Sequence, residues 1–189
     1  GLPAIYIPEA YGGIGGGLME LVIATEEISR ACGGVGVTYA ASSLGSFPII
    51  IGGSEEQKKK YLPAIAAGEE YAAFCLTEAG AGSDVASMQT TARKVGDDYV
   101  LNGTKQWITN GCEAHTYTVF AKTDKTRGAR GISAFIVRKG QPGLKFGKKE
   151  DKLGIRASAT YEVIFEDCVV KKEDLMGREG AGFGIAMKT

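Results

Sequence analysis

Hydrophobic residues in the first third of the chain recur with the period of a helix. Between residues 18 and 31, apolar side chains return every three or four positions, and Gly33 and Gly34 follow. This pattern predicts an amphipathic helix that ends at a glycine cap. Residues 35–51 carry almost no charge, which predicts a second helix that is buried on nearly all sides and broken near Pro48.

A third helix is predicted just before the hydrophobic period changes. Ser54 and Gln57 have the spacing of a capping box, in which each side chain bonds the backbone N–H of the other residue. We expect this helix to begin after Ser54 and to stop at Pro63. Residues 1–69 are therefore predicted to form part of an N-terminal helical domain.

After Gly68 the period becomes that of strands. Short runs rich in β-branched and aromatic residues alternate with turns rich in Gly, Asp, Asn and Pro. The predicted strands are residues 71–76, 87–95, 99–109, 116–122, 132–139, 144–148 and 160–170. Strands with no helix between them favour an antiparallel barrel or sandwich. We predict an α+β chain whose middle domain, residues 70–172, is an antiparallel β-barrel, followed by the start of a further helical domain at residues 173–189.

Composition narrows the classes of partner. The 189 residues are 44% hydrophobic, and 22 basic residues balance 22 acidic ones. This balance gives no bulk attraction to nucleic acid or to an anionic membrane, and no apolar run reaches the ~20 residues of a membrane span. Four widely spaced cysteines without a CxxC pair are typical of a reducing compartment, either cytoplasm or mitochondrial matrix. The final GFGIAMKT ends within an apolar pattern, so we expect a fragment of a longer protein.

Several chemistries lack the residues that they need. Gly80-Ala81-Gly82 resembles the start of a dinucleotide fingerprint, but Val85 stands at the third glycine position and no helix follows. His115 is the only histidine, so a catalytic triad has a single candidate base in a loop. Cys112 and His115 could offer two zinc ligands, but no second pair exists. No metal site is predicted.

The strongest candidate site combines two polar stretches, FCLTEAGAGSD at residues 74–84 and QWITNG further along the chain. Each lies across the end of a predicted strand, where hydroxyls and backbone N–H groups point over the sheet edge. Strand alternation places Trp107 and Thr109 on one face, which offers an aromatic plane beside a hydroxyl to a planar polar ligand. The alternative is that Trp107 is a core residue and the hydroxyls cap turns, and the pattern alone leaves both interpretations open.

Both stretches resemble signatures of the acyl-CoA dehydrogenase family. FCLTEAGAGSD resembles the motif (Y/F)-C-x-T-E-P-x-A-G-S-D, and KQWITNG is similar to K-x-W-I-T-N at the usual separation. Similar stretches continue to both ends of the chain, among them GLPAIYIPEAYGG and GREGAGFGIAMKT. The phrase GKKEDKLGIRASAT, with FEDC, resembles the short-chain, butyryl-type members.

The resemblance implies an FAD-dependent oxidoreductase of fatty acid β-oxidation. It implies oxidation of a short-chain acyl-CoA to trans-2-enoyl-CoA, transfer of electrons to an electron-transferring flavoprotein, and a homotetrameric parent protein. Thr77 would bond the pyrimidine end of the flavin, Thr109 would lie near its N5, and Ser83 would reach both the pyrophosphate and the pantetheine of the substrate. The implied FAD-binding residues are Phe74, Cys75, Leu76, Thr77, Gly82, Ser83, Trp107, Ile108 and Thr109.

The resemblance also implies what these residues do not supply. In the family the catalytic base lies in a C-terminal helical bundle, so no catalytic residue is assigned and we expect the chain to be inactive alone. Glu78 is expected to be structural, and Ala79 stands where proline is usual, which loosens the turn without removing a donor. Two alternatives remain, a non-catalytic β-barrel binding module and a relative of the acyl-CoA oxidases.

Overall fold

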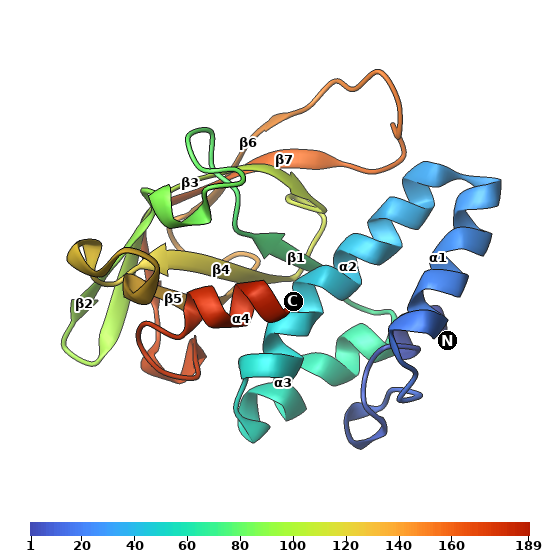
Figure 1. The fold of residues 1–189 in the computed structure, drawn as a ribbon, viewed down its shortest axis with the longest axis horizontal. Coiled ribbons are helices and arrows are strands. Elements are labelled where there is room, and N and C mark those ends of the chain that lie inside the picture. The colour runs from blue at the N-terminus through green and yellow to red at the C-terminus, as the bar shows by residue number, and fades with distance from the viewer.

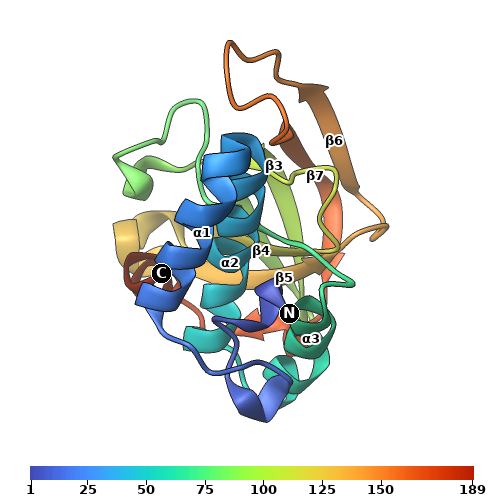
Figure 2. The ribbon, with the colours of Figure 1, turned by 90° about the vertical axis from the view of Figure 1, so that its right-hand side faces the viewer.

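A computed structural model describes all 189 residues and shows a helical part beside a curled sheet (Figure 1). The helices are α1 (Leu18–Ala31), α2 (Gly33–Gly52), α3 (Glu55–Ala67) and α4 (Gly182–Lys188). Short 3-10 turns at Leu2–Ala4, Glu9–Tyr11, Val85–Ser87, Lys125–Gly131 and Lys172–Asp174 connect the larger elements. Figure 2 shows α1 as an outer layer over α2, which in turn lies against the sheet. The predicted order of helices, strands and a final helix is confirmed.

Pro48 lies inside α2 and Pro63 lies inside α3, and both helices continue past the proline. The predicted break at Pro48 and the predicted stop at Pro63 are therefore wrong. A proline inside a helix costs about 3 kcal/mol because it removes one backbone hydrogen bond and crowds the preceding turn. In α3 the turn after Pro63 places Ile65 and Ala66 in the core. Burying a side chain such as Ile65 contributes about 1.5–3 kcal/mol, which offsets that cost.

The glycine pair predicted to cap α1 instead opens α2. Cys32 separates the two helices in an extended conformation, with φ −157° and ψ 109°. A Cβ on Gly34 would lie 2.7 Å from the Cβ of Ala157, which belongs to the connection between two later strands. Gly34 therefore allows the start of α2 to contact the sheet domain closely.

Eight strands form one sheet in the order β6-β7-β3-β2-β4-β5-β8, with β1 beside β4. Their bounds are β1 (Ala72–Cys75), β2 (Thr91–Val95), β3 (Asp98–Thr109), β4 (Thr116–Lys122), β5 (Ile132–Arg138), β6 (Leu144–Lys149), β7 (Thr160–Val170) and β8 (Leu175–Met176). The seven predicted strands are present, and the two-residue β8 was missed because it is too short to show a period. The sheet curls around an interior, and its hydrogen-bonded path is open between β6 and β8.

The α+β class is confirmed, but the sheet is mixed rather than antiparallel. Ala72 pairs with Thr116 and Cys75 with Val119, so β1 runs parallel to β4. A parallel pair requires a long connection, and the β2–β3 hairpin lies between these two strands in the sequence. The sequence pattern shows the strands but not the direction in which non-consecutive strands pair.

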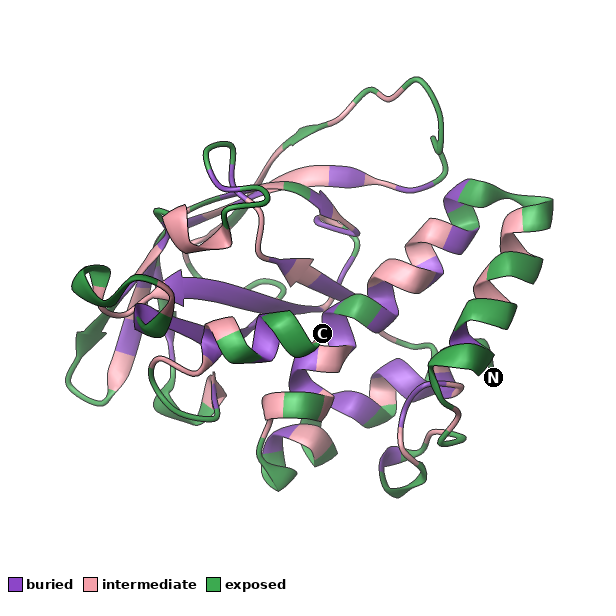
Figure 3. Ribbon diagram, in the orientation of Figure 1, coloured by how far each residue is buried: buried purple, intermediate pink, exposed green.

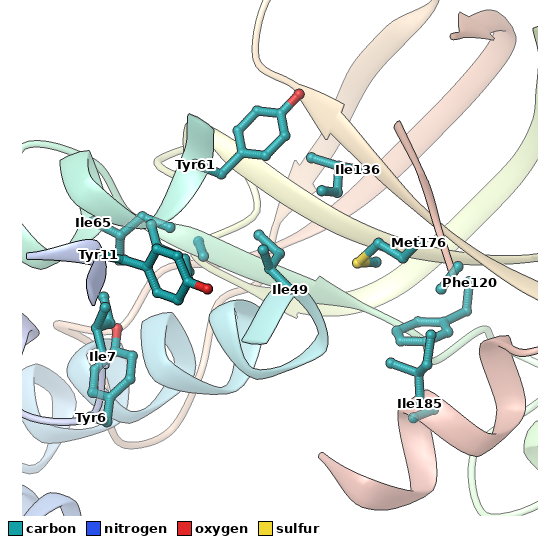
Figure 4. Packing of buried hydrophobic residues seen from close by; sticks show 14 of the residues in the cluster. Tyr6, Ile7, Tyr11, Ile49, Tyr61, Ile65, Phe120, Ile136, Met176 and Ile185 are labelled. Atoms are coloured by element: carbon teal, nitrogen blue, oxygen red, sulfur yellow. The ribbon is translucent and has the colours of Figure 1, made fainter. Parts of the chain in front are cut away.

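Alternation along the strands separates two hydrophobic cores. In β4, Val119 and Ala121 face the interior of the curled sheet, whereas Phe120 faces the helices. Figure 3 shows β4 and β5 as buried along their length. Figure 4 shows the helix-side core, where Ile49 of α2 and Ile185 of α4 lie on the same side of the sheet as Phe120.

Close packing of α2 on β1 fixes the strand that leads into the candidate site. A Cβ on Gly45 would lie 2.6 Å from the backbone N of Ala73 and 2.7 Å from the carbonyl C of Ala72. The Ser42 hydroxyl accepts a hydrogen bond of 3.1 Å from the Ala72 N–H. Contrary to the sequence expectation that no apolar run is long enough, α2 could cross a membrane by length and composition, but half of its most apolar stretch is buried inside the protein, as in the core helix of a folded domain.

Candidate functional site

The two polar stretches singled out in the sequence meet at the end of β1. The Gln106 N–H of β3 donates a 2.9 Å hydrogen bond to the carbonyl oxygen of Thr77. The Lys105 Nζ donates a 2.9 Å hydrogen bond to the carbonyl oxygen of Leu76. The structure therefore brings Thr77 beside the segment that carries Trp107 and Thr109, as the candidate site requires.

The loop after Thr77 folds back on itself. Glu78 and Ala81 exchange backbone hydrogen bonds of 3.1 and 3.0 Å, which closes a tight turn. The Ser87 hydroxyl donates to the carbonyl oxygens of Gly80, at 3.2 Å, and of Asp84, at 2.8 Å. These hydrogen bonds use the carbonyl oxygens of the loop as acceptors. The N–H groups of Gly82 and Ser83 have no acceptor within the protein.

Several donors of the predicted site have no partner within the protein. The backbone N–H groups of Thr77, Gly82 and Ser83 make no intramolecular hydrogen bond. All three residues are at least partly exposed, so their N–H groups are available to a ligand. Unpaired backbone N–H groups of one loop can donate hydrogen bonds to the oxygens of an anionic ligand.

Gly80 and Gly82 meet no steric demand from the protein itself. A Cβ added at either position would find no atom within 4 Å, and neither residue has a positive φ. The absence of side chains therefore leaves open space outside the loop. A ligand could approach the backbone there as closely as the unpaired amides require.

Trp107 is exposed, which excludes the alternative that it is a core residue. Trp107 is 57% exposed, and its φ of 54° lies in the left-handed region. The register between β3 and β7 shifts between Lys105 and Ile108, so Trp107 sits in a β-bulge. Ile108 is buried in the sheet interior and Thr109 is half-buried, an alternation that agrees with a shared outer face for Trp107 and Thr109.

Two predicted site residues turn their side chains away from any ligand. Cys75 is fully buried in the sheet interior, and this burial raises the pKa of its thiol to about 12. Ile108 is 3% exposed in the same core. Both residues could contact a ligand only through backbone atoms. Phe74 packs toward the helix side, where the centroid of its ring lies 5.1 Å from that of Phe120.

A buried ion pair beneath the loop was not predicted as part of the site. Lys105 and Glu78 have side-chain exposures of 0% and 8%, and Lys105 Nζ lies 2.8 Å from Glu78 Oε1. Glu78 also accepts hydrogen bonds from the N–H groups of Gln89, at 2.6 Å, and Thr90, at 3.0 Å. Glu78 is thus held inside the fold, in agreement with the expected structural role. A lysine in a β-strand gives no sequence signal of burial.

The ion pair shifts the pKa of both partners. Burial alone would raise the pKa of Glu78, but the charge of Lys105 and the hydrogen bonds from Gln89, Lys105 and Thr90 outweigh it and hold that pKa below its usual range. Burial lowers the pKa of Lys105, while the attraction of Glu78 opposes this effect. The pair remains a charged contact because each partner is hydrogen-bonded to the other.

Family models match nearly the whole chain. Residues 1–69 match the N-terminal domain of acyl-CoA dehydrogenases, and residues 73–168 match their middle domain. A short-chain specific acyl-CoA dehydrogenase of Clostridium acetobutylicum is 50% identical over 190 aligned residues, which cover all of this chain and 50% of that protein. The chain therefore spans about half the length of this relative.

Solved structures have the same fold. A chain of the structure described as the electron transferring flavoprotein of Acidaminococcus fermentans is 54% identical with a TM-score of 0.97, over all of this chain and 50% of that one. An acyl-CoA dehydrogenase from Bacillus anthracis, solved in complex with FAD, is 46% identical with a TM-score of 0.92, over 99% of this chain and 32% of that one.

Proposed function

The chain belongs to the acyl-CoA dehydrogenase family, and from this premise we propose that its Thr77–Ser83 loop and its Trp107–Thr109 segment bind the flavin of an acyl-CoA dehydrogenase. The observation that carries the proposal is the convergence of these two segments, joined by the 2.9 Å bond from the Gln106 N–H to the Thr77 carbonyl oxygen. Around this joint lie unpaired amides, open space over two glycines and an exposed indole.

Each residue type fits a part of FAD. The backbone N–H groups of Gly82 and Ser83 suit the pyrophosphate, because its oxygens accept several hydrogen bonds and glycine lets them approach the backbone closely. The exposed Trp107 supplies a plane for stacking on the isoalloxazine ring. Thr77 and Thr109 supply donors for its pyrimidine end and its N5 atom. Leu76 and Phe74 complete the wall beside β1, and Cys75 and Ile108 contribute backbone atoms only.

When bound, FAD accepts hydride, and the reduced ring carries more negative charge than the oxidised ring. Donors that point at the ring therefore bind the reduced form more tightly, by about 1.5–3 kcal/mol for a hydrogen bond to a charged group. Thr77 and Thr109 are proposed to act in this way. The half-buried position of Thr109 limits competition from water for its hydroxyl.

We further propose that the substrate is a short-chain acyl-CoA, which is dehydrogenated to the trans-2-enoyl-CoA. This is supported by the identity to a relative named short-chain specific, and Ser83 is proposed to contact the pantetheine. An electron-transferring flavoprotein is the proposed electron acceptor and a homotetramer the proposed assembly of the parent protein. Four free cysteines suit a reducing compartment, either bacterial cytoplasm or mitochondrial matrix.

No residue of this chain is proposed as the base that removes the substrate α-proton. Glu78, which directly follows Thr77 in the chain, is buried and held by Lys105 and two backbone N–H groups. A base must reach the proton that it removes. We therefore propose that the 189 residues bind flavin but do not turn over an acyl-CoA alone.

The test is a flavin titration of the purified protein, followed by absorbance and by quenching of flavin fluorescence. We expect saturable binding of FAD, and a loss of about ten-fold in affinity for Trp107→Ala, because the stacking plane is removed. Trp107→Phe should retain part of the affinity. Leu153→Ala, at a fully exposed apolar position in the β6–β7 connection, is the matched control and should bind like the parent protein.

Two results would contradict the proposal. A protein that binds no FAD would favour the non-catalytic binding module. Equal affinity of the parent protein and Trp107→Ala would place the flavin elsewhere. Rapid oxidation of the reduced flavin by oxygen, in the presence of acyl-CoA and the rest of the parent protein, would instead favour an oxidase-type relative.

A further inference from the structure

Lys105 lies directly behind the proposed flavin-binding loop and touches none of the ligand-facing donors itself. Its Nζ bonds the Leu76 carbonyl oxygen at 2.9 Å and Glu78 Oε1 at 2.8 Å, and Met88 Sδ lies at 3.9 Å. The side chain is completely buried. Lys105 belongs to β3 and Leu76 to the loop after β1, so this contact joins the two segments of the proposed site.

The contact with Leu76 acts on the peptide group that also carries the Thr77 N–H. No cis peptide bond is present, and in a trans peptide the N–H points away from the carbonyl oxygen. The Lys105 ammonium therefore lies on one side of this peptide, and the unpaired Thr77 N–H points to the other. A charged donor on the oxygen draws electron density from the peptide and makes its N–H a stronger donor.

Glu78 balances this charge. It lies one residue after Thr77, pairs with Lys105, and is fixed by the N–H groups of Gln89 and Thr90. A cation and an anion thus stand together under the loop, in a region with little water to screen them. Removal of either one leaves the other uncompensated.

We propose that Lys105 and Glu78 form a buried charge pair that sets the reduction potential of the bound flavin, Lys105 through the Leu76–Thr77 peptide and Glu78 by limiting the effect of Lys105. This inference rests on the proposed flavin site. Both are positioning residues, since neither is placed against the flavin itself. The charge of Lys105 favours the more negative reduced form, and the charge of Glu78 opposes it.

The test is the reduction potential of bound FAD in three variants, measured by equilibration with a reference dye. Lys105→Met removes the cation and should lower the potential, and Glu78→Gln removes the anion and should raise it. The double variant removes both charges and should return toward the parent value. Each single change should alter the ratio of affinities for reduced and oxidised FAD by about ten-fold, the size expected for one charge-assisted hydrogen bond.

The opposite signs separate charge tuning from structural damage. A loosened loop would disturb the binding of FAD in the same way in both single variants. It would therefore move the potential in the same direction in both. Lys148→Met is the matched control, because it removes the same charge from an exposed position on β6 and should leave the potential unchanged. Thermal unfolding of each variant reports the cost to stability independently.

Shifts of the same sign, or potentials equal to that of the parent protein, would overturn the inference while FAD binding itself stood. If Lys105→Met does not fold, Glu78→Gln and the double variant decide, since the double variant buries no unpaired charge. The potential must then rise in the first and return in the second. A parent protein that binds no FAD would overturn the flavin site and this inference together.

Discussion

Gly45 is the position where one added methyl group tests how α2 holds the site. In Gly45→Ala, the new Cβ would lie 2.6 Å from the N atom of Ala73 and 2.7 Å from the carbonyl C of Ala72. Both are backbone atoms of β1, so no side chain can turn aside to relieve the contact. Overpacking of this kind costs about 1–3 kcal/mol, whereas replacing a helical glycine with alanine gains about 1 kcal/mol.

The two terms predict a net loss of up to about 2 kcal/mol in the free energy of unfolding. Gly184→Ala is the control, because Gly184 is helical and exposed and its added Cβ would meet no atom within 4 Å. It should be neutral or stabilising by at most about 1 kcal/mol. Urea unfolding followed by far-UV circular dichroism measures both.

The position of β1 links this stability change to the site. If Gly45→Ala pushes β1 away from α2, the loop that follows β1 moves, and FAD affinity should fall in Gly45→Ala but not in Gly184→Ala. Equal stabilisation of both variants would refute the reasoning. Helix propensity alone would then explain the result, and the close contact of α2 with β1 would have no effect on the free energy of unfolding.

Three further predictions concern single side chains. Thr109→Val should lower the potential of bound FAD by about 30–60 mV with an unchanged melting temperature, since a hydrogen bond of 1.5–3 kcal/mol to the reduced ring is lost; an unshifted potential in dye equilibration would remove Thr109 from the N5 contact. Hydrogen bonds and the charge of Arg138 lower the pKa of Glu70 from 4.5, so its contribution to stability is present above that value and is lost as the pH falls through the lower folded pKa; unfolding curves should therefore show a weaker acid dependence below pH 4.5 in Glu70→Gln than in the parent protein. A thiol reagent should modify the exposed Cys32 in the native protein but Cys75, whose buried thiol has a pKa raised to about 12, only after unfolding; labelling of Cys75 before Cys32, detected by mass spectrometry of the peptides, would contradict this prediction.

Local patterns predicted the longer helices and strands well because each of them has a clear period, whereas the two-residue β8 has none. The change from helical to strand spacing after Gly68 marks the real change of structure, and the capping box at Ser54 is present, with the Gln57 N–H donating to the Ser54 hydroxyl at 3.2 Å. The errors at Pro48 and Pro63 have one cause. Local propensity gave the cost of a proline correctly, but burial in the tertiary fold outweighed it.

The candidate site was predictable as a set of residues and not as a geometry. Alternation suggested a shared face for Trp107 and Thr109, but the bulge that gives Trp107 its φ of 54° depends on the pairing of β3 with β7. The pairing of Lys105 with Glu78 joins residues 27 positions apart, and neither residue type indicates burial by itself. The contact depends on β3 lying beside the end of β1 in the folded chain, which no local pattern shows.

The most direct test of the flavin site is a crystal structure of the protein grown with FAD. The structure should show the isoalloxazine ring stacked on Trp107 with Thr109 at its N5, and the pyrophosphate against the amides of Gly82 and Ser83. FAD bound at another surface, or clear density for these residues with no flavin beside them at saturating FAD, would contradict the account.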